Sequence, residues 1–323
     1  MTALLWTYDD LLAGCGGALF DPTFACDSIS GIEIDSRNCK LGDLFVALAS
    51  DRQDGHDFIT KAADAGAAAC LVSRPNADAS IAQIIVDDPL GALARLGRTG
   101  RDRFAGKMVG ITGSVGKTGC KDMLAHALTA FGKTHASQRS FNNHIGVPIT
   151  LATLAADCDF AVQEMGMNAA GEIAALTALA RPDIALITRI ASTHAGFFDS
   201  LDDIAKAKAE IFQGLQAGGT AILNIDDPFY DQLASAATTA GAARIISFGR
   251  KDDAEFCLLE ARQHDDGMTV HAEIVGRELR FEMQMHGIHW AQNALGILAC
   301  VDALGLSVEA AATQLASCPT PKG

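Results

Sequence analysis

A glycine-rich loop with a lysine lies in the first half of the chain, where its residue types suit phosphate binding. Residues 110–122 read GITGSVGKTGCKD; the apolar run MVGIT leads into the loop, and CKDMLAHALTAF, with helical periodicity, follows it. Backbone amides at a helix start and one lysine can hold a polyphosphate, and the hydroxyl of Thr118 can bind Mg²⁺. The usual motif has a glycine where this chain has Ile111, so an ordinary glycine-rich turn is the alternative. We predict a nucleotide-binding loop made of Thr112, Gly113, Ser114, Val115, Gly116, Lys117 and Thr118.

Two further side chains follow predicted strands, where the ligands of open α/β sheets gather. Glu164 ends the run DFAVQ, and His194 comes a few residues after DIALITRI. A carboxylate at this edge can hold Mg²⁺ beside a γ-phosphate; the alternative for Glu164 is a strand-terminal side chain in solvent. A lone histidine is more often structural than a metal ligand, and spacing gives no role to the other histidines.

Lys208 is predicted to face inward from a helix. In SLDDIAKAKAEIFQGL (200–215), Lys208 falls on the apolar stripe and Lys206 does not. Ser200 is the expected N-cap, with Asp203 as an acid in the first turn. An inward lysine either snorkels to the surface or becomes a neutral amine, which can add CO₂ to form a carbamate. The stripe consists of Leu201, Ile204, Ile211 and Leu215.

These side chains need a sheet that brings strand ends together. Apolar runs at 108–112, 160–163, 184–190, 221–225 and 244–248 alternate with helical stretches, which is typical of a mostly parallel, doubly wound sheet. Residues 254–285 predict short strands around a Gly-Arg turn, and HWAQNALGILACVDALG returns to helix. The predicted fold class is α/β, with a P-loop ATPase-type central domain that contains a short antiparallel section.

Residues 28–90 predict a separate small α/β unit. The strand-like pieces ISGIEI, DLFVAL, ACLV and AQIIV accompany a helix in GHDFITKAADAGA. PLGALARLGRTGRDRF then predicts a helix that leads out of the unit, with Pro89 in its first turn. A chain of 323 residues is long for one core, so we expect two domains, at 1–105 and 106–323.

Composition narrows the functional classes. Hydrophobic residues at 49% and charged residues at 20% indicate a globular chain, and a net charge of −14 without a basic stripe argues against nucleic-acid binding. No window approaches the roughly 18 apolar residues that a membrane span needs, and the start lacks a signal-peptide pattern. Nine scattered cysteines without a Cys-x-x-Cys pair indicate reduced thiols. We expect a cytoplasmic monomer.

The loop, of form Thr-Gly-x-x-Gly-Lys-Thr, resembles the ATP loop of the Mur ligase family, the amide-forming ligases of peptidoglycan precursor synthesis, which also includes folylpolyglutamate synthase. DSRNCKLGDLFVAL...DGHDF (35–58), FNNHIGVPITLA (141–152) and EMGMNAAGEIAAL (164–176) resemble the branch that adds D-alanyl-D-alanine to UDP-N-acetylmuramoyl-tripeptide. The Asn-Asn-x-x-Gly-Val-Pro string is the most specific of these, because other members carry different residues there. The resemblance covers residues 28–323.

This resemblance implies roles for individual residues. It makes Lys117 a catalytic phosphate ligand, and it makes Thr118, Glu164, His194 and a carbamylated Lys208 ligands of Mg²⁺. It places His289 and Asn293 on the adenine side, although both could simply cap or pack a helix start. The implied substrate contacts are Ser36 and Arg37 at the uridine diphosphate end, where an ordinary surface arginine is the alternative, together with Asn142 and Asn143.

The implied reaction is a two-step amide synthesis. The tripeptide carboxylate attacks the γ-phosphate of ATP, and the amine of D-alanyl-D-alanine then displaces phosphate from the acyl phosphate. The alternatives are a sibling ligase, folylpolyglutamate synthase, or a non-catalytic UDP-precursor-binding protein. Two departures matter: Gly119 replaces a second Thr or Ser, and the family has a C-terminal domain after a Lys-Gly-Arg-Gly-like junction, whereas this chain ends at Lys322-Gly323. We therefore expect the chain by itself to bind ATP weakly and to be inactive or impaired.

Overall fold

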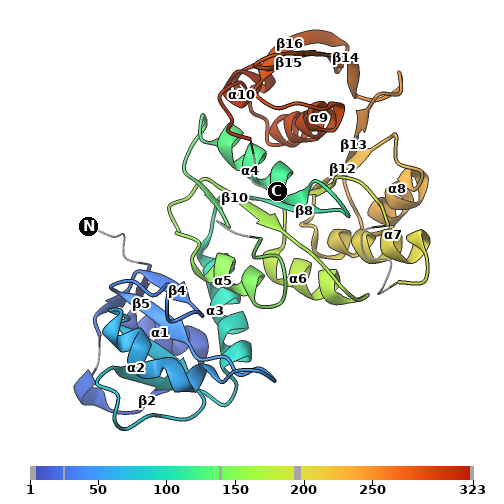
Figure 1. Cartoon of the computed structure of the whole chain (residues 1–323). Coiled ribbons are helices and arrows are strands. Elements are labelled where there is room, and N and C mark those ends of the chain that lie inside the picture. Colours follow the sequence, from blue (N-terminus) through green and yellow to red (C-terminus); the bar gives the residue numbers. More distant parts are fainter. Residues whose placement is uncertain (1–4, 25, 138–139, 193–197, 321–323) are drawn as a thin grey trace. The chain divides into compact units, whose positions relative to one another are not determined.

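The computed structural model describes residues 5–24, 26–137, 140–192 and 198–320 (Figure 1). The chain divides into two compact units, one formed by Met1–Phe104 with Pro148–Ala156 and the other by Ala105–Val147 with Asp157–Gly323. The segment Pro148–Ala156 was not expected in the first unit, because it follows the phosphate loop in the chain. Helix α5 (Gly146–Ala152) supplies most of it.

The first unit is built on a five-stranded sheet in the order β2-β7-β6-β5-β4. Strands β4 to β7 are parallel, and β2 is antiparallel to β7. Every residue of β5 and β6 is buried, as expected for parallel strands that are covered on both faces. The elements are β1 (Trp6–Thr7), α1 (Tyr8–Cys15), β2 (Ala18–Leu19), η1 (Pro22–Phe24), β3 (Ser28–Ile29), β4 (Gly31–Glu33), β5 (Asp43–Val46), η2 (Gly55–Phe58), α2 (Ile59–Asp64), β6 (Ala69–Val72), β7 (Ala82–Ile85) and α3 (Pro89–Arg103).

Helix α3 begins as the sequence predicted. Pro89 is its first residue, and the side chain of Asp88 accepts a hydrogen bond from the amide of Leu90 at 3.0 Å. A Cβ on Gly100 would lie 2.1 Å from the carbonyl oxygen of Leu151, so α3 and α5 approach through a position that only glycine can fill. This contact explains why residues after 147 belong to the first unit.

The second unit contains a nine-stranded sheet in the order β16-β15-β14-β13-β12-β11-β8-β10-β9. Strands from β9 to β14 in this order are parallel, and β14, β15 and β16 are antiparallel. The mostly parallel α/β fold with an antiparallel section is therefore confirmed. The elements are β8 (Lys107–Thr112), α4 (Lys117–Leu128), β9 (Thr134–Ala136), β10 (Phe160–Glu164), α6 (Glu172–Ala180), β11 (Ile184–Ile187), α7 (Leu201–Ala209), η3 (Glu210–Gly214), β12 (Thr220–Asn224), α8 (Tyr230–Thr239), β13 (Arg244–Gly249), β14 (Phe256–His264), β15 (Gly267–Ile274), β16 (Arg277–Met283), α9 (Ile288–Ala303) and α10 (Val308–Leu315).

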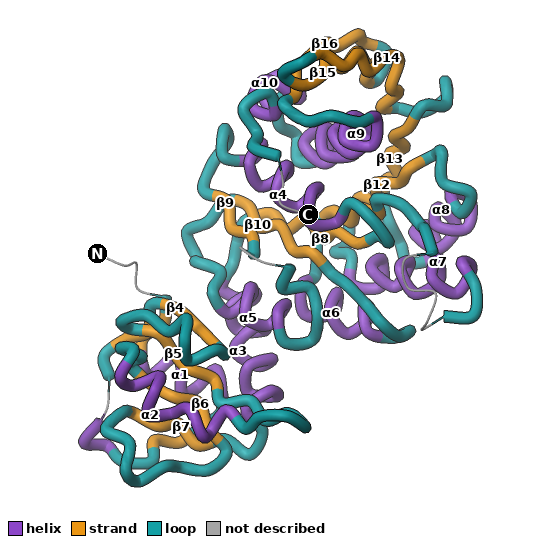
Figure 2. Tube along the Cα trace, viewed as in Figure 1, coloured by secondary structure: helices purple, strands orange, loops and turns teal. Residues whose placement is uncertain are grey.

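The order of strands determines where the winding of this sheet reverses. After β8 the chain builds β9 and β10 on one side of β8 and then crosses to β11 on its other side. Helices α4 and α9 lie on one face of the sheet, and α6 and α8 lie on the other (Figures 1 and 2). Ligands of such sheets bind where the direction of winding reverses, beyond the carboxyl ends of the strands. Here that point lies beyond β8, β10 and β11.

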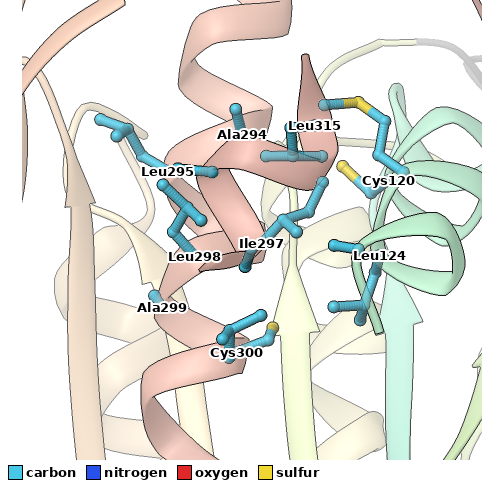
Figure 3. Close-up of a cluster of buried hydrophobic side chains, with 14 of the residues drawn as sticks. Cys120, Leu124, Ala294, Leu295, Ile297, Leu298, Ala299, Cys300 and Leu315 are labelled. Carbon is cyan, nitrogen blue, oxygen red and sulfur yellow. The ribbon is translucent and has the colours of Figure 1, made fainter. Parts of the chain in front are cut away.

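The main core of this unit lies between the sheet and helices α4, α9 and α10. Figure 3 shows Ile297 and Cys300 of α9 opposite Cys120 and Leu124 of α4, all of them at most 1% exposed. Helix α4 starts directly after the glycine-rich loop, so this packing fixes the loop to the sheet.

The antiparallel strands are longer than predicted. They have nine, eight and seven residues, and the ladder packs against α9 through β14 and against α10 through β16. In the described part of the chain, no helix combines the length and hydropathy that crossing a bilayer requires. Each of the nine cysteines is a free thiol.

Candidate functional site

The glycine-rich loop joins β8 to α4, as predicted. Gly113 and Gly116 have φ of 148° and 84°, values that side chains rarely allow. A Cβ on Gly113 would lie 1.9 Å from Oγ1 of Thr188, so the loop also needs glycine for space. Gly116 is the N-cap of α4 and offers no side-chain acceptor, which leaves the first amides of the helix for an anion.

A segment after β11 holds this loop from the side. The amide of Ser114 donates to the carbonyl of Arg189 at 2.7 Å, and Oγ1 of Thr188 donates to the carbonyl of Val115 at 2.6 Å. This support differs from the prediction, because the apolar run 184–190 indicated one continuous strand. Strand β11 ends at Ile187, and the following residues leave the ladder to bind the loop.

Glu164 lies at the end of β10, with its carboxylate beside the loop. The residue is 1% exposed; Oε2 accepts a hydrogen bond from Oγ1 of Thr118 at 3.0 Å, and Oε1 accepts one from Nδ2 of Asn142 at 2.7 Å. The alternative of a solvent-exposed glutamate is therefore wrong. A buried carboxylate with polar partners on both oxygens is held in one orientation.

The two asparagines predicted to contact substrate, Asn142 and Asn143, have different surroundings. Asn142 contacts Glu164, and its carbonyl accepts the amide of Gly166 at 2.7 Å. Asn143 is exposed, and its Oδ1 accepts the amides of Ile145 and Gly146 at the start of α5. The structure thus brings Asn142 into the site beside the loop and gives Asn143 a capping contact.

Lys117 is the first residue of α4, and its amine turns back over the loop. Nζ donates to the carbonyls of Gly113 at 2.8 Å and Ser114 at 3.4 Å. Burial lowers the pKa of Lys117, and the negative charge of Glu164 opposes that fall. A γ-phosphate can replace these carbonyl contacts with stronger charge-assisted hydrogen bonds.

Lys208 faces inward from α7, as its place on the stripe predicted. It is 0% exposed, and Nζ has no hydrogen-bond partner. Burial and, to a smaller extent, the positive charge of Lys117 together lower the pKa of Lys208 to about 7. Lys206 instead extends into solvent and pairs with Asp202. One member of the predicted stripe is wrong: Leu201 is 41% exposed, because the helix has only begun there.

The oxygen atoms around the loop suit a magnesium ion. Mg²⁺ uses one or two carboxylates together with substrate phosphates, and Glu164 and Thr118 offer a carboxylate and a hydroxyl in contact. Among the described residues, no three His, Cys, Asp or Glu side chains form a metal site of their own. His194, a predicted ligand, lies outside the described residues. Lys208 could offer Mg²⁺ an oxygen ligand only as its carbamate, because an ammonium group has no lone pair and a neutral amine has only a nitrogen donor, whereas Mg²⁺ prefers oxygen.

The two predicted adenine-side residues differ in their surroundings. Asn293 on α9 lies against the loop, because a Cβ on Gly116 would be 3.1 Å from its Nδ2. His289 is exposed, and its ring lies 5.3 Å from that of Trp290. Only Asn293 is therefore brought next to the phosphate loop by a described contact.

The predicted uridine diphosphate residues follow β4 in the first unit. Ser36 is 7% exposed, whereas the Arg37 side chain is 85% exposed and pairs with Asp35 at 2.6 Å. Strands β4, β5 and β6 are parallel, so their carboxyl ends share one edge of the sheet. A second pair, Arg74 with Asp54, comes from the segments after β6 and β5, and sequence reasoning had not singled it out.

Two protein-family models match this chain, one in each part of it. Residues 111–301 match the model of the Mur ligase middle domain, and residues 28–100 match that of the Mur ligase family, catalytic domain. The first match alone covers more than half of the chain.

Several similar proteins have a known identity. UDP-N-acetylmuramoyl-tripeptide--D-alanyl-D-alanine ligases from Bacillus subtilis and Escherichia coli are 36% and 35% identical over 93% and 90% of this chain. This chain spans 64% of the length of each, which is less than two thirds. MurF from Acinetobacter baumannii superimposes with a TM-score of 0.87 at 31% identity, covering 98% of this chain and 69% of that one. MurF from Thermotoga maritima in complex with ADP gives 0.74 at 26% identity, covering 89% of this chain and 65% of that one.

Proposed function

Because the chain belongs to the Mur ligase family, we propose that it carries the ATP-binding and UDP-substrate-binding parts of an ATP-dependent amide ligase. The reaction proposed is addition of D-alanyl-D-alanine to UDP-N-acetylmuramoyl-tripeptide through an acyl phosphate. The names of the similar proteins support this substrate pair. The first unit would hold the UDP-linked substrate and the second unit ATP.

The observation that carries the proposal is the buried contact between Glu164 and Thr118. It joins the end of β10 to the first turn after the phosphate loop, with 3.0 Å between the two oxygens. A phosphate loop alone fits many nucleotide-binding proteins. A carboxylate beside the loop hydroxyl additionally provides a place for the cation that accompanies a γ-phosphate.

The residues of the chain would act mainly by position and charge. The free amides at the start of α4 hold the β- and γ-phosphates, and Lys117 exchanges its carbonyl contacts for phosphate oxygens. Asn142 keeps the Glu164 carboxylate oriented. Asn293 lies on the α9 side of the loop, where it could contact the nucleotide base. These contacts keep the γ-phosphate in place for attack by the tripeptide carboxylate.

Magnesium would be held by Glu164 and Thr118, with Lys208 as a carbamate, and would supply positive charge at the transferring phosphoryl group. Two features support carbamate formation at Lys208. The side chain is wholly buried without a hydrogen-bond partner, and its pKa of about 7 provides neutral amine near neutral pH. Carbamylation would turn an unpaired buried cation into an anionic oxygen ligand.

Binding and product measurements test this function. We expect calorimetry to detect UDP-N-acetylmuramoyl-tripeptide and Mg·ADP binding, with Lys117→Ala losing only the nucleotide. Mass spectrometry of mixtures with ATP and D-alanyl-D-alanine tests for the pentapeptide product directly. A product formed from a free diamino acid would favour a sibling ligase, and tight binding of the UDP-tripeptide without any nucleotide binding would favour a non-catalytic binding protein. Failure to bind either substrate would refute the proposal.

The nine free thiols support a reducing compartment, and we propose the cytoplasm. The proposed oligomeric state is a monomer, which light scattering coupled to gel filtration tests.

A further inference from the structure

Glu210 connects the helix that carries Lys208 to the start of another helix. It is the first residue of η3, which continues directly from α7. Its Oε1 accepts the amide of Gly171 at 2.7 Å, and its Oε2 accepts the amide of Ala174 at 3.0 Å. Both amides belong to the first turn of α6, where helices have unpaired donors and favour a negative charge. One carboxylate therefore ties α7 and η3 to α6.

The segment between Glu164 and α6 is fixed at both ends. At its start, the amide of Met165 donates to the carbonyl of Ile111 at 2.8 Å, which attaches the segment to β8. At its other end, Gly171 has a φ of 87° and donates to Glu210. These two contacts connect the segment after Glu164 to β8 at one end and to Glu210, directly after α7, at the other. They therefore limit how far α7 can move relative to the strand that ends in Glu164.

Glu210 also leaves Lys208 without a counter-ion. Residues two apart on a helix point in nearly opposite directions, so the carboxylate and the amine do not face each other. Both carboxylate oxygens already accept backbone amides. Lys208 Nζ consequently stays buried and unpaired, although an acid lies two positions away in the sequence.

We propose that Glu210 is a positioning residue, which holds α7 against α6 so that Lys208 remains buried. A second contact supports the same attachment, since Oγ1 of Thr177 on α6 donates to the carbonyl of Ile211 at 2.8 Å. The inference rests on the proposed function for the use made of Lys208; the positioning itself rests on the contacts of Glu210.

Acylation of lysines tests the positioning without any ligand. The 323-residue protein is treated with an amine-acylating reagent in CO₂-free buffer, and labelling of Lys208 is measured by peptide mass spectrometry relative to Lys206. Loss of a helix-capping carboxylate has a free-energy cost that corresponds to about a fivefold change in an equilibrium, so Glu210→Ala should raise the ratio about fivefold. Glu210→Gln keeps one acceptor oxygen, should give a smaller rise, and is the fallback if the alanine variant does not fold.

Glu172→Gln is the matched control. Glu172 is another acid in the first turn of α6, and its Oε2 accepts the amide of Asn168 at 2.7 Å, in the segment that precedes α6 and not on η3. The Glu172→Gln protein should keep the labelling ratio of Lys208 within about twofold of wild type, because this carboxylate bonds a local backbone amide and does not tie α6 to η3. Equal ratios in the Glu172→Gln and Glu210→Ala proteins, or an unchanged ratio in the latter, would overturn the inference.

A double-mutant cycle on Mg·ADP binding shows whether Glu210 acts through Lys208. Glu210→Ala should weaken the affinity about fivefold in the wild-type background and less than about twofold in the Lys208→Ala background, because coupled residues are not additive. Equal weakening in both backgrounds would mean a general structural effect and contradict the proposal. A wild-type protein that does not bind Mg·ADP would refute the proposed function, whereas the labelling ratio would still decide the role of Glu210.

Discussion

Replacing Lys208 by methionine should stabilise the protein while removing a residue of the proposed site. The side chain is 0% exposed and its amine has no hydrogen-bond partner, so the folded state contains a buried group that prefers to be neutral. Methionine has a similar shape, no charge, and the flexibility to fill the space. The Lys208→Met protein should therefore have a higher free energy of unfolding than wild type and a weaker proposed function.

The magnitude follows from the pKa of Lys208. A fall from the ordinary 10.5 to about 7, at about 1.4 kcal/mol for each pKa unit, corresponds to a cost of about 5 kcal/mol in the folded state below pH 7. Because the folded-state pKa is the lower one, the unfolded chain binds more protons between these values. The stability contributed by Lys208 therefore rises with pH through the window from 7 to 10.5 and is lost as pH falls.

Urea unfolding at two pH values is the assay. The advantage of Lys208→Met over wild type should shrink by about 3 kcal/mol between about pH 6.5 and about pH 9.5, measured in CO₂-free buffer so that no carbamate forms. Lys206→Met is the matched control, because Lys206 lies on the same helix and extends into solvent. The urea midpoint of the Lys206→Met protein should show the same pH dependence as that of wild type. A Lys208→Met protein that is less stable than wild type at both pH values would refute the reasoning.

Three further substitutions test the site. Lys117→Ala should abolish detectable Mg·ATP binding by calorimetry and leave the near-ultraviolet circular dichroism unchanged, because the amine contacts loop carbonyls and no core residue; binding near the wild-type level would contradict the loop assignment. Thr118→Val should weaken Mg·ADP binding roughly tenfold, since the hydroxyl proposed to hold Mg²⁺ beside the buried Glu164 carboxylate is lost; the tenfold difference from wild type should vanish when Mg²⁺ is omitted. Gly113→Ala should also lose nucleotide binding, because its Cβ would meet Oγ1 of Thr188 at 1.9 Å; unchanged affinity would show that the loop can move aside.

Local patterns in the sequence predicted the parts of the site that depend on nearby residues. The strand, glycine loop and helix at 107–128 follow each other directly, and Lys208 faces inward because the helical period alone decides which side of α7 it occupies. Ser200 caps α7, since its hydroxyl accepts the amide of Asp203 only three residues later. Such features need no knowledge of distant segments.

Tertiary structure decided which distant segments meet. Thr118 and Glu164 are 46 residues apart, Val115 and Thr188 are 73 apart, and Gly171 and Glu210 are 39 apart. The first two contacts exist because the strand order places β10 and β11 on either side of β8, and the third because η3 packs against α6. No propensity or period encodes that arrangement. The sequence therefore determined the groups available for phosphate chemistry, whereas the sheet topology determined which of them share a hydrogen bond, because these bonds require atoms from separate strand ends to lie within about 3 Å.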